Sequence, residues 1–166
     1  MANDLPKVVM YTDGSSIGNP GPGGYGVVIQ QGARRKELSG GFRRTTNNRM
    51  ELMAVIVGLQ ALKAPSEVSV MTDSKYVSDA VNLGWARRWR ANNWKKNKRE
   101  KALNPDLWEK LLELCERHQV SFTWVRGHAG HKENVRCDRL AVQAANQSGL
   151  PLDIPYEQDS GQPSLF

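Results

Sequence analysis

The sequence predicts an α/β fold built on a five-stranded mixed sheet with helices on both faces. Three short β-rich segments precede the first helical segment, and the brief connections between them predict an antiparallel trio. Helical and β-rich segments then alternate, and a β-α-β crossover favours parallel pairing of the last two strands with a right-handed connection. At 166 residues, the chain is expected to form one domain with a sizeable core.

The expected strands cover residues 8–12, 25–30, 35–42, 67–71 and 120–125. Most are rich in β-branched and aromatic residues, and residues 35–42 alternate in the way a half-buried strand requires. Gly18–Gly24 contains only glycine, proline and one asparagine. Glycine and proline break both helices and strands, so this segment is expected to be a loop.

The expected helices cover residues 47–63, 74–83, a segment from Asn104 onward, and residues 133–147. In the first, apolar residues recur at helical spacing, and Pro105 suits the first turn of the third. From Ser148 onward the chain is rich in Pro, Gly, Gln, Ser and Asp. This composition predicts a folded domain of residues 1–147 followed by a flexible tail of residues 148–166.

The net charge of +6 is concentrated in one segment, residues 85–101. Its basic residues are Arg87, Arg88, Arg90, Lys95, Lys96, Lys98, Arg99 and Lys101. With eight bases and one acid this segment carries +7, so the remainder carries −1. A polyanionic partner is therefore expected on one side of the molecule.

The sequence also indicates a cytoplasmic protein. No apolar run approaches the length of a membrane span, and the first residues lack the basic and apolar parts of a signal peptide. The two cysteines, Cys115 and Cys137, are expected to be reduced thiols rather than a disulfide.

Four carboxylates stand in short polar or glycine-containing islands, at Asp13, Glu51, Asp73 and Asp138. If the fold gathers them, their mutual repulsion has to be neutralised. An all-oxygen set suits hard divalent cations such as Mg²⁺ or Mn²⁺ rather than Zn²⁺. Each residue alone has an ordinary structural alternative. Asp13 could be a turn aspartate, and Glu51 could form a capping box with Asn48. Asp73 could be a helix N-cap, and Asp138 could be an acid near a helix N-terminus.

Several motifs occur together across residues 7–147. They are Thr12-Asp-Gly-Ser15, Thr45-Thr-Asn-Asn-Arg-Met-Glu-Leu-Met53, Thr72-Asp-Ser74, Gly127-His-Ala-Gly-His131 and Cys137-Asp138, with the glycine-rich segment Gly18–Gly26. In this combination and order they resemble the bacterial type 1 ribonuclease H family. The resemblance implies a ribonuclease H-like fold and a monomeric enzyme.

The family's activity would be hydrolysis of the RNA strand of RNA/DNA hybrids, leaving 5′-phosphate and 3′-hydroxyl ends. The resemblance implies that Asp13, Glu51, Asp73 and Asp138 hold two Mg²⁺ ions, with Mn²⁺ as a substitute, and that Asp13 bridges them. His128 would assist proton transfer or product release. A zinc site of His128, His131 and Cys137 is the disfavoured alternative, because it lacks a paired-cysteine motif. The enzyme would remove RNA from hybrids in replication and from R-loops.

The resemblance also implies substrate contacts. Residues that would face the minor groove are Ser16, Asn19, Asn47, Asn48 and Lys75. Thr46 and Asn104 would hold a phosphate of the DNA strand. A basic protrusion, residues 85–101, would grip the DNA strand through Trp85, Arg88, Trp89, Lys95 and Lys96. The alternative for the tryptophans is that they hold the protrusion together.

Three further hypotheses follow from the sequence. Gln162-Pro-Ser-Leu-Phe166 is similar to peptides that dock on the bacterial sliding clamp, although the tail could instead pack on the domain through Leu150, Leu152, Ile154 and Tyr156. A non-catalytic hybrid-binding module is disfavoured because it would gain nothing from carboxylates near phosphates. A recombinase of the same fold is disfavoured because the short chain has no second DNA-binding domain.

Overall fold

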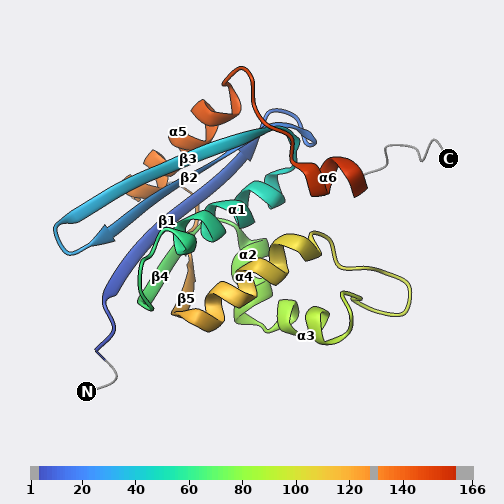
Figure 1. Cartoon of the computed structure of the whole chain (residues 1–166), viewed down its shortest axis with the longest axis horizontal. Coiled ribbons are helices and arrows are strands. Elements are labelled where there is room, and N and C mark those ends of the chain that lie inside the picture. The colour runs from blue at the N-terminus through green and yellow to red at the C-terminus, as the bar shows by residue number, and fades with distance from the viewer. Residues whose placement is uncertain (1–3, 128–130, 160–166) are drawn as a thin grey trace.

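The computed structural model describes residues 4–127 and 131–159 (Figure 1). The strands are β1 (Lys7–Ser16), β2 (Gly21–Gln31), β3 (Arg34–Thr45), β4 (Glu67–Thr72) and β5 (Gln119–Trp124). They form one five-stranded sheet in the order β3-β2-β1-β4-β5. β2 is antiparallel to both β1 and β3, whereas β4 is parallel to both β1 and β5. The predicted mixed sheet is confirmed.

Helices cover both faces of this sheet, as predicted. They are α1 (Asn47–Gln60), α2 (Lys75–Asn82), α3 (Trp85–Ala91), α4 (Pro105–Arg117), α5 (Lys132–Ala145) and α6 (Ile154–Asp159). Figure 1 places α1 and α5 on opposite faces. Because successive strand residues point to opposite faces, Val27 packs in the large core with α1, whereas Val28 packs against Cys137 and Leu140 of α5. In the described part of the chain, no helix has the length and apolar character needed to cross a membrane.

The prediction that Gly18–Gly24 is entirely loop is wrong for its second half, because β2 begins at Gly21. Glycine is tolerated here because the backbone of α5 passes very close to the strand. A Cβ on Gly24 would lie 2.3 Å from the carbonyl oxygen of Ala141, and one on Gly26 would lie 2.3 Å from that of Cys137. The glycines therefore let α5, which carries Asp138, pack directly against the sheet.

The prediction that regular structure ends near Ser148 is also wrong, since residues 154–159 form α6. Asp153, just before α6, is buried and accepts hydrogen bonds from Arg49 and Thr45. Of the apolar residues expected to pack, Leu152 and Ile154 are 46% and 55% exposed. Leu150 and Tyr156 are half-buried, and the Tyr156 ring lies 5.7 Å from the Arg49 guanidinium. The contacts of Asp153 and Tyr156 with Arg49 thus attach this part of the tail to the domain, while Leu152 and Ile154 stay largely exposed.

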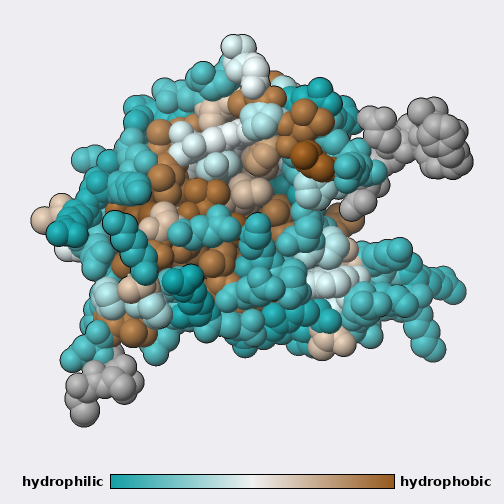
Figure 2. All heavy atoms as spheres, viewed as in Figure 1, coloured by the Kyte–Doolittle hydropathy of each residue, from teal (hydrophilic) through white to brown (hydrophobic). Residues whose placement is uncertain are grey.

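The basic segment, residues 85–101, begins with α3 and continues as a loop that Figure 1 shows extending beyond α4. An isolated pairing of Lys95 with Lys101 and a turn capped by Asn97 shape its tip. Figure 2 shows this projection covered by hydrophilic residues. The segment is therefore a protrusion with an exposed basic surface.

Candidate active site

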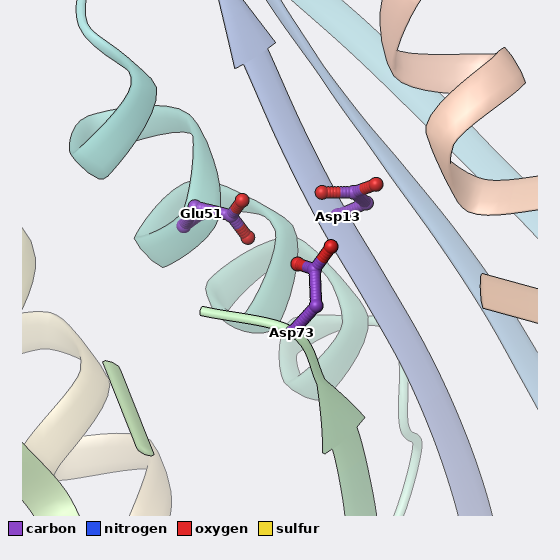
Figure 3. A group of neighbouring side chains, drawn as sticks. All are labelled: Asp13, Glu51 and Asp73. Carbon is purple, nitrogen blue, oxygen red and sulfur yellow. The ribbon is translucent and has the colours of Figure 1, made fainter. Parts of the chain in front are cut away.

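Three carboxylates from distant parts of the sequence converge beside the central strand β1, near the carboxyl end of β4 (Figure 3). Asp13 lies on β1, Glu51 on α1, and Asp73 directly after β4. β1 and β4 are parallel neighbours, with Thr12 opposite Thr72, so the residues that follow them lie side by side. One carboxylate oxygen from each of the three residues lies within 4.8 Å of the others.

Gly14 allows α1 to approach β1 at this point. A Cβ on Gly14 would lie 2.3 Å from the backbone nitrogen of Glu51. At that distance backbone atoms would have to move, so only glycine permits this packing. The glycine after Asp13 therefore brings Glu51 next to Asp13, and the Gly14 N–H donates to Asp13 Oδ1 at 2.8 Å.

The grouping makes the charged forms of these acids unfavourable. Burial, together with the negative charges of Asp73 and Asp138, raises the pKa of Asp13 to about 7, although its contacts with Glu51 and the Gly14 N–H oppose the shift. Burial and the charges of Asp13 and Asp73 raise the pKa of Glu51 well above its ordinary value. Glu51 Oε2 is buried and has no hydrogen-bond partner among the described residues. Oxygen donors in this arrangement fit a hard divalent cation, which would neutralise them.

Asp138 faces the same pocket but lies outside the group of three. It comes from α5, which Asn134 anchors by donating from Nδ2 to the carbonyl of Met71 at 3.1 Å. Cys137 donates its thiol proton to the carbonyl of Tyr11 at 3.2 Å. The residues that line the pocket are Asp13, Gly14, Asn47, Asn48, Glu51, Asp73, Ser74, Lys75, Tyr76 and Asp138. The structure therefore places all four predicted carboxylates around one pocket.

Three of the predicted groove residues hydrogen-bond to one another beside this pocket. Asn47 Oδ1 accepts from the N–H of Ser16 at 2.7 Å and from its hydroxyl at 2.9 Å, and the Asn47 N–H donates to Asn19 Oδ1 at 3.1 Å. Because the Ser16 N–H can only donate, the side-chain atom of Asn47 that faces it must be the amide oxygen. The NH₂ group of Asn47 therefore points away from Ser16 and can donate to another group.

Lys75 lies at the pocket edge against an aromatic ring. Its Nζ is 5.3 Å from the centroid of Trp124, a cation–π contact. Trp124 in turn donates from Nε1 to the carbonyl of Asp73 at 3.1 Å. Trp124 thus contacts both Lys75 and Asp73, the carboxylate residue that directly follows β4.

Thr46 and Asn104, predicted phosphate contacts, have structural roles in this arrangement. Thr46 caps α1, its Oγ1 accepting from the N–H of Arg49 at 3.2 Å. Asn104 accepts from Arg49 Nη1 at 3.3 Å and donates to the Tyr76 hydroxyl at 3.3 Å. The hydroxyl of Thr46 keeps a proton to donate, and the NH₂ group of Asn104 keeps its second hydrogen, because it donates only one to Tyr76.

In the protrusion, the tryptophans differ in exposure. Trp89 packs edge-to-face on the buried Trp108, with centroids 6.0 Å apart, and Lys96 Nζ lies 5.8 Å from its centroid. Trp85 is 37% exposed, and Lys95, Lys96 and Arg88 are exposed. The alternative in which tryptophans hold the protrusion together applies to Trp89, while Trp85 and the basic residues remain accessible.

Comparison with known proteins agrees with this geometry. The model of the RNase H family matches residues 6–146. The chain belongs to the RNase H family. A ribonuclease H from Trichodesmium erythraeum is 60% identical over 157 residues, covering 95% of this chain and all of that protein. A ribonuclease H from Desulforamulus reducens is 64% identical over 151 residues, covering 91% of this chain and 95% of its own. An RNase H is a nuclease, so the chain is an enzyme.

Solved RNase H structures share the fold. LC9-RNase H1, described as a type 1 RNase H with the type 2 active-site motif, has a TM-score of 0.76 at 34% identity, covering 96% of this chain and 83% of its own. LC11-RNase H1, solved in complex with RNA/DNA hybrid, has a TM-score of 0.65 at 26% identity, covering 83% of this chain and 96% of its own.

Some predicted residues of this RNase H lie outside the described part of the chain. They are His128 and the tail peptide Gln162–Phe166.

The disfavoured zinc alternative also depends on His128. Its third member, Cys137, is buried, and its thiol donates to the Tyr11 carbonyl. Cys115 and Cys137 are both free, as predicted.

Sequence reasoning missed the residues of this RNase H that position the site rather than line it. Arg49, Tyr76 and Trp124 support the predicted residues through the contacts above. A charged Arg49 among the apolar residues of α1 was the available signal, because a buried charge requires partners.

Proposed function

We propose that the chain hydrolyses the RNA strand of RNA/DNA hybrids at the pocket where Asp13, Glu51 and Asp73 converge. The observation that carries this proposal is the approach of their oxygens to within 4.8 Å beside the amides of Asn47 and Asn48. Membership of the RNase H family supports it, as does the hybrid bound to LC11-RNase H1.

The carboxylates would hold two divalent cations, Mg²⁺ or in its place Mn²⁺. Asp13 would contribute to both ions, and Glu51, Asp73 and Asp138 would complete their ligands. When bound, the ions would supply positive charge to the phosphate oxygens and lower the pKa of a water. The oxygen of a water would bond to phosphorus while the bond from phosphorus to the 3′-oxygen breaks. The water would give up a proton and the 3′-oxygen would take one up, which leaves 5′-phosphate and 3′-hydroxyl ends.

The chain's own amides would select RNA. Asn47 presents its NH₂ group because Ser16 engages its oxygen, so it would donate to a groove acceptor or a 2′-hydroxyl. Ser16, Asn19, Asn48 and Lys75 would contribute to the same minor-groove contact. Such contacts read the sugar rather than the base sequence, so cleavage would be largely sequence-independent.

The DNA strand would lie against the protrusion. Trp85, Arg88, Lys95 and Lys96 would contact its backbone, with Trp89 supporting the surface from below. Thr46 would donate its hydroxyl proton to a DNA phosphate while capping α1, and Asn104 would contribute to the same phosphate site.

His128 would act in proton transfer or product release. His128→Ala is expected to slow turnover without abolishing it, because water can partly replace a proton relay. Unchanged turnover by this variant would exclude the role.

The test is cleavage of an end-labelled RNA/DNA hybrid in Mg²⁺, compared with RNA/RNA, DNA/DNA and single-stranded RNA. Asp13→Asn protein and an EDTA reaction provide the controls. Hybrid-only cleavage that requires metal and Asp13 is the expected result. Binding without cleavage would instead indicate a hybrid-binding module, and cleavage of DNA duplexes would indicate a recombinase.

The cellular setting is a further part of the proposal. The enzyme would act as a cytoplasmic monomer on hybrids formed in replication and on R-loops. Gln162–Phe166 would dock on the sliding clamp. A pull-down with purified clamp tests this, and retention that is unaffected by Leu165→Ala and Phe166→Ala would contradict it.

A further inference from the structure

A second pocket lies at the end of the sheet opposite the carboxylates. It is enclosed by the start of β1, the β2–β3 hairpin and the chain after α1, and has a volume of about 380 Å³. Ile29, Ala61 and Leu62 contribute apolar atoms, together with Pro6 and Ala64. Figure 2 shows an apolar area on the face where α1 packs on the sheet. The volume lies within the range of pockets that hold small ligands.

The rim of this pocket is basic. Arg34, Arg35, Lys36 and Lys63 line it, and none of the described residues that line it is acidic. Arg35 is neutralised by Glu37 at 2.9 Å and Glu133 at 2.8 Å. Arg34, Lys36 and Lys63 are exposed, and within residues 4–127 and 131–159 none of them forms an ion pair. Three positive charges therefore surround the apolar floor without compensation.

We infer that this pocket binds an acidic segment of a partner protein, which places a large apolar side chain on Ile29 and Leu62. The carboxylates of the segment pair with Arg34, Lys36 and Lys63. Charge complementarity selects an acidic partner, and the buried apolar side chain supplies the central contact that anchors such interfaces.

The basic rim and the apolar floor together disfavour both a nucleic acid and a wholly apolar segment as the ligand. A nucleic-acid backbone would pair with the rim but would leave the half-buried side chains of Ala61 and Leu62 on the floor uncovered, so it would gain no hydrophobic stabilisation there. A wholly apolar segment would cover the floor but desolvate Lys63 and its neighbours without a partner. An acidic segment with an apolar anchor satisfies both.

Docking here leaves the carboxylate pocket open. The two pockets share no lining residue. Along β1, Lys7 and Asp13 are separated by roughly 20 Å, from the rise per residue of a strand. The partner would therefore bring the enzyme to a location without competing with its hybrid, and the inference does not depend on the proposed function.

The test uses two fluorescein-labelled ten-residue peptides, each with five aspartates and one apolar residue, Phe or Leu. Binding to the full chain is followed by fluorescence anisotropy at low salt. A peptide with Ser in place of Phe tests the floor, and Lys63→Glu and Arg34→Glu test the rim. Lys110→Glu, an exposed charge reversal on α4, is the matched control.

The expected result is binding that weakens about tenfold with each rim reversal and with the Ser peptide, but is unchanged in Lys110→Glu. The circular dichroism spectrum and thermal unfolding of the Lys63→Glu protein should match wild type, which shows that it is folded. Three results would overturn the inference: no binding of either peptide, binding indifferent to Lys63→Glu, or equal competition at this site by a single-stranded oligonucleotide.

Discussion

Arg49 and Asp153, 104 residues apart in sequence, form a buried bidentate ion pair. Arg49 Nε donates to Asp153 Oδ2 at 2.7 Å and Nη2 donates to Oδ1 at 3.0 Å. Both side chains are 3% exposed. Arg49 also pairs with Asp106 at 2.7 Å, so the first turn of α1, the start of α4 and the chain before α6 meet at one guanidinium. That turn of α1 carries Asn47 and Asn48, and Glu51 follows it directly.

Replacing Asp153 should therefore destabilise the protein. Asp153→Asn leaves the buried charge of Arg49 with only Asp106, and breaking such a pair costs about 3 kcal/mol. Urea unfolding of both proteins measures the difference. Glu157→Gln is the control, because the Arg43–Glu157 pair is solvent-exposed on its arginine side and should contribute at most about 1 kcal/mol. Equal stability of wild type and Asp153→Asn would contradict a stabilising role.

Asp13→Asn should abolish cleavage and yet raise stability in EDTA. The raised pKa of Asp13 reflects burial and repulsion by Asp73, both of which a neutral amide relieves. Such relief at an active site contributes roughly 1–2 kcal/mol. Thermal unfolding in EDTA and hybrid cleavage in Mg²⁺ are measured on the same preparations, with Asp79→Asn as the control outside the pocket. Lower stability of Asp13→Asn would show that the carboxylates do not repel one another.

His118 should make stability depend on pH. It is buried, and its Nδ1 accepts from the Ser66 N–H at 3.0 Å. Burial, and to a smaller extent the charge of Arg117, lowers its pKa below the ordinary value of 6.5. The unfolded chain therefore binds the proton at a higher pH than the folded one. Stability from this group is complete above pH 6.5 and is lost as pH falls toward the folded pKa.

Urea unfolding between about pH 5 and pH 8 measures this dependence. His118→Asn removes the titrating group and offers an oxygen acceptor to Ser66, so its stability should vary less over the same interval. An identical pH dependence in both proteins would assign the effect to other groups.

Gly26→Ala should destabilise the packing of α5 on the sheet. The added Cβ would meet the carbonyl of Cys137 at 2.3 Å, and overpacking of this kind costs about 3 kcal/mol. Gly40→Ala is the matched control, since its Cβ would meet the side chain of Tyr25, which can turn away. Chemical unfolding compares the two, and a larger loss in Gly40→Ala would contradict the assigned role of the glycine.

Lys75→Gln should weaken hybrid binding and reduce its dependence on salt. The ammonium group held against Trp124 would lie in the minor groove between the two phosphate backbones, so its loss should lower the slope of log affinity against log salt by about 1. Binding is measured in an Asp13→Asn background, which prevents cleavage. Lys110→Gln, on α4, should leave the slope unchanged, and an unchanged slope in Lys75→Gln would exclude a charged contact of Lys75 with the hybrid.

Local pattern was sufficient for most of the fold. The strand directions and the helices over both faces follow from alternation, helical spacing and short connections, and the structure confirms them. The differences occur where close packing overrides local preference. β2 starts among glycines because α5 needs their missing Cβ atoms. α1 ends at Gln60 rather than at the predicted residue 63, and the Leu62 N–H beyond it bonds to the carbonyl of Leu59, three residues back.

The candidate site also has features that the sequence predicts and features that depend on the tertiary structure. The sequence by itself determined which acids and amides are present and that they stand at strand and helix ends, because a motif is a local property of the chain. Only the tertiary structure decided that Asp13, Glu51 and Asp73 meet while Asp138 lies farther off, and that Arg49 joins Asp153. Those relationships depend on parallel pairing, on the approach allowed by Gly14 and on buried charge compensation, and each of these joins residues that are distant along the chain.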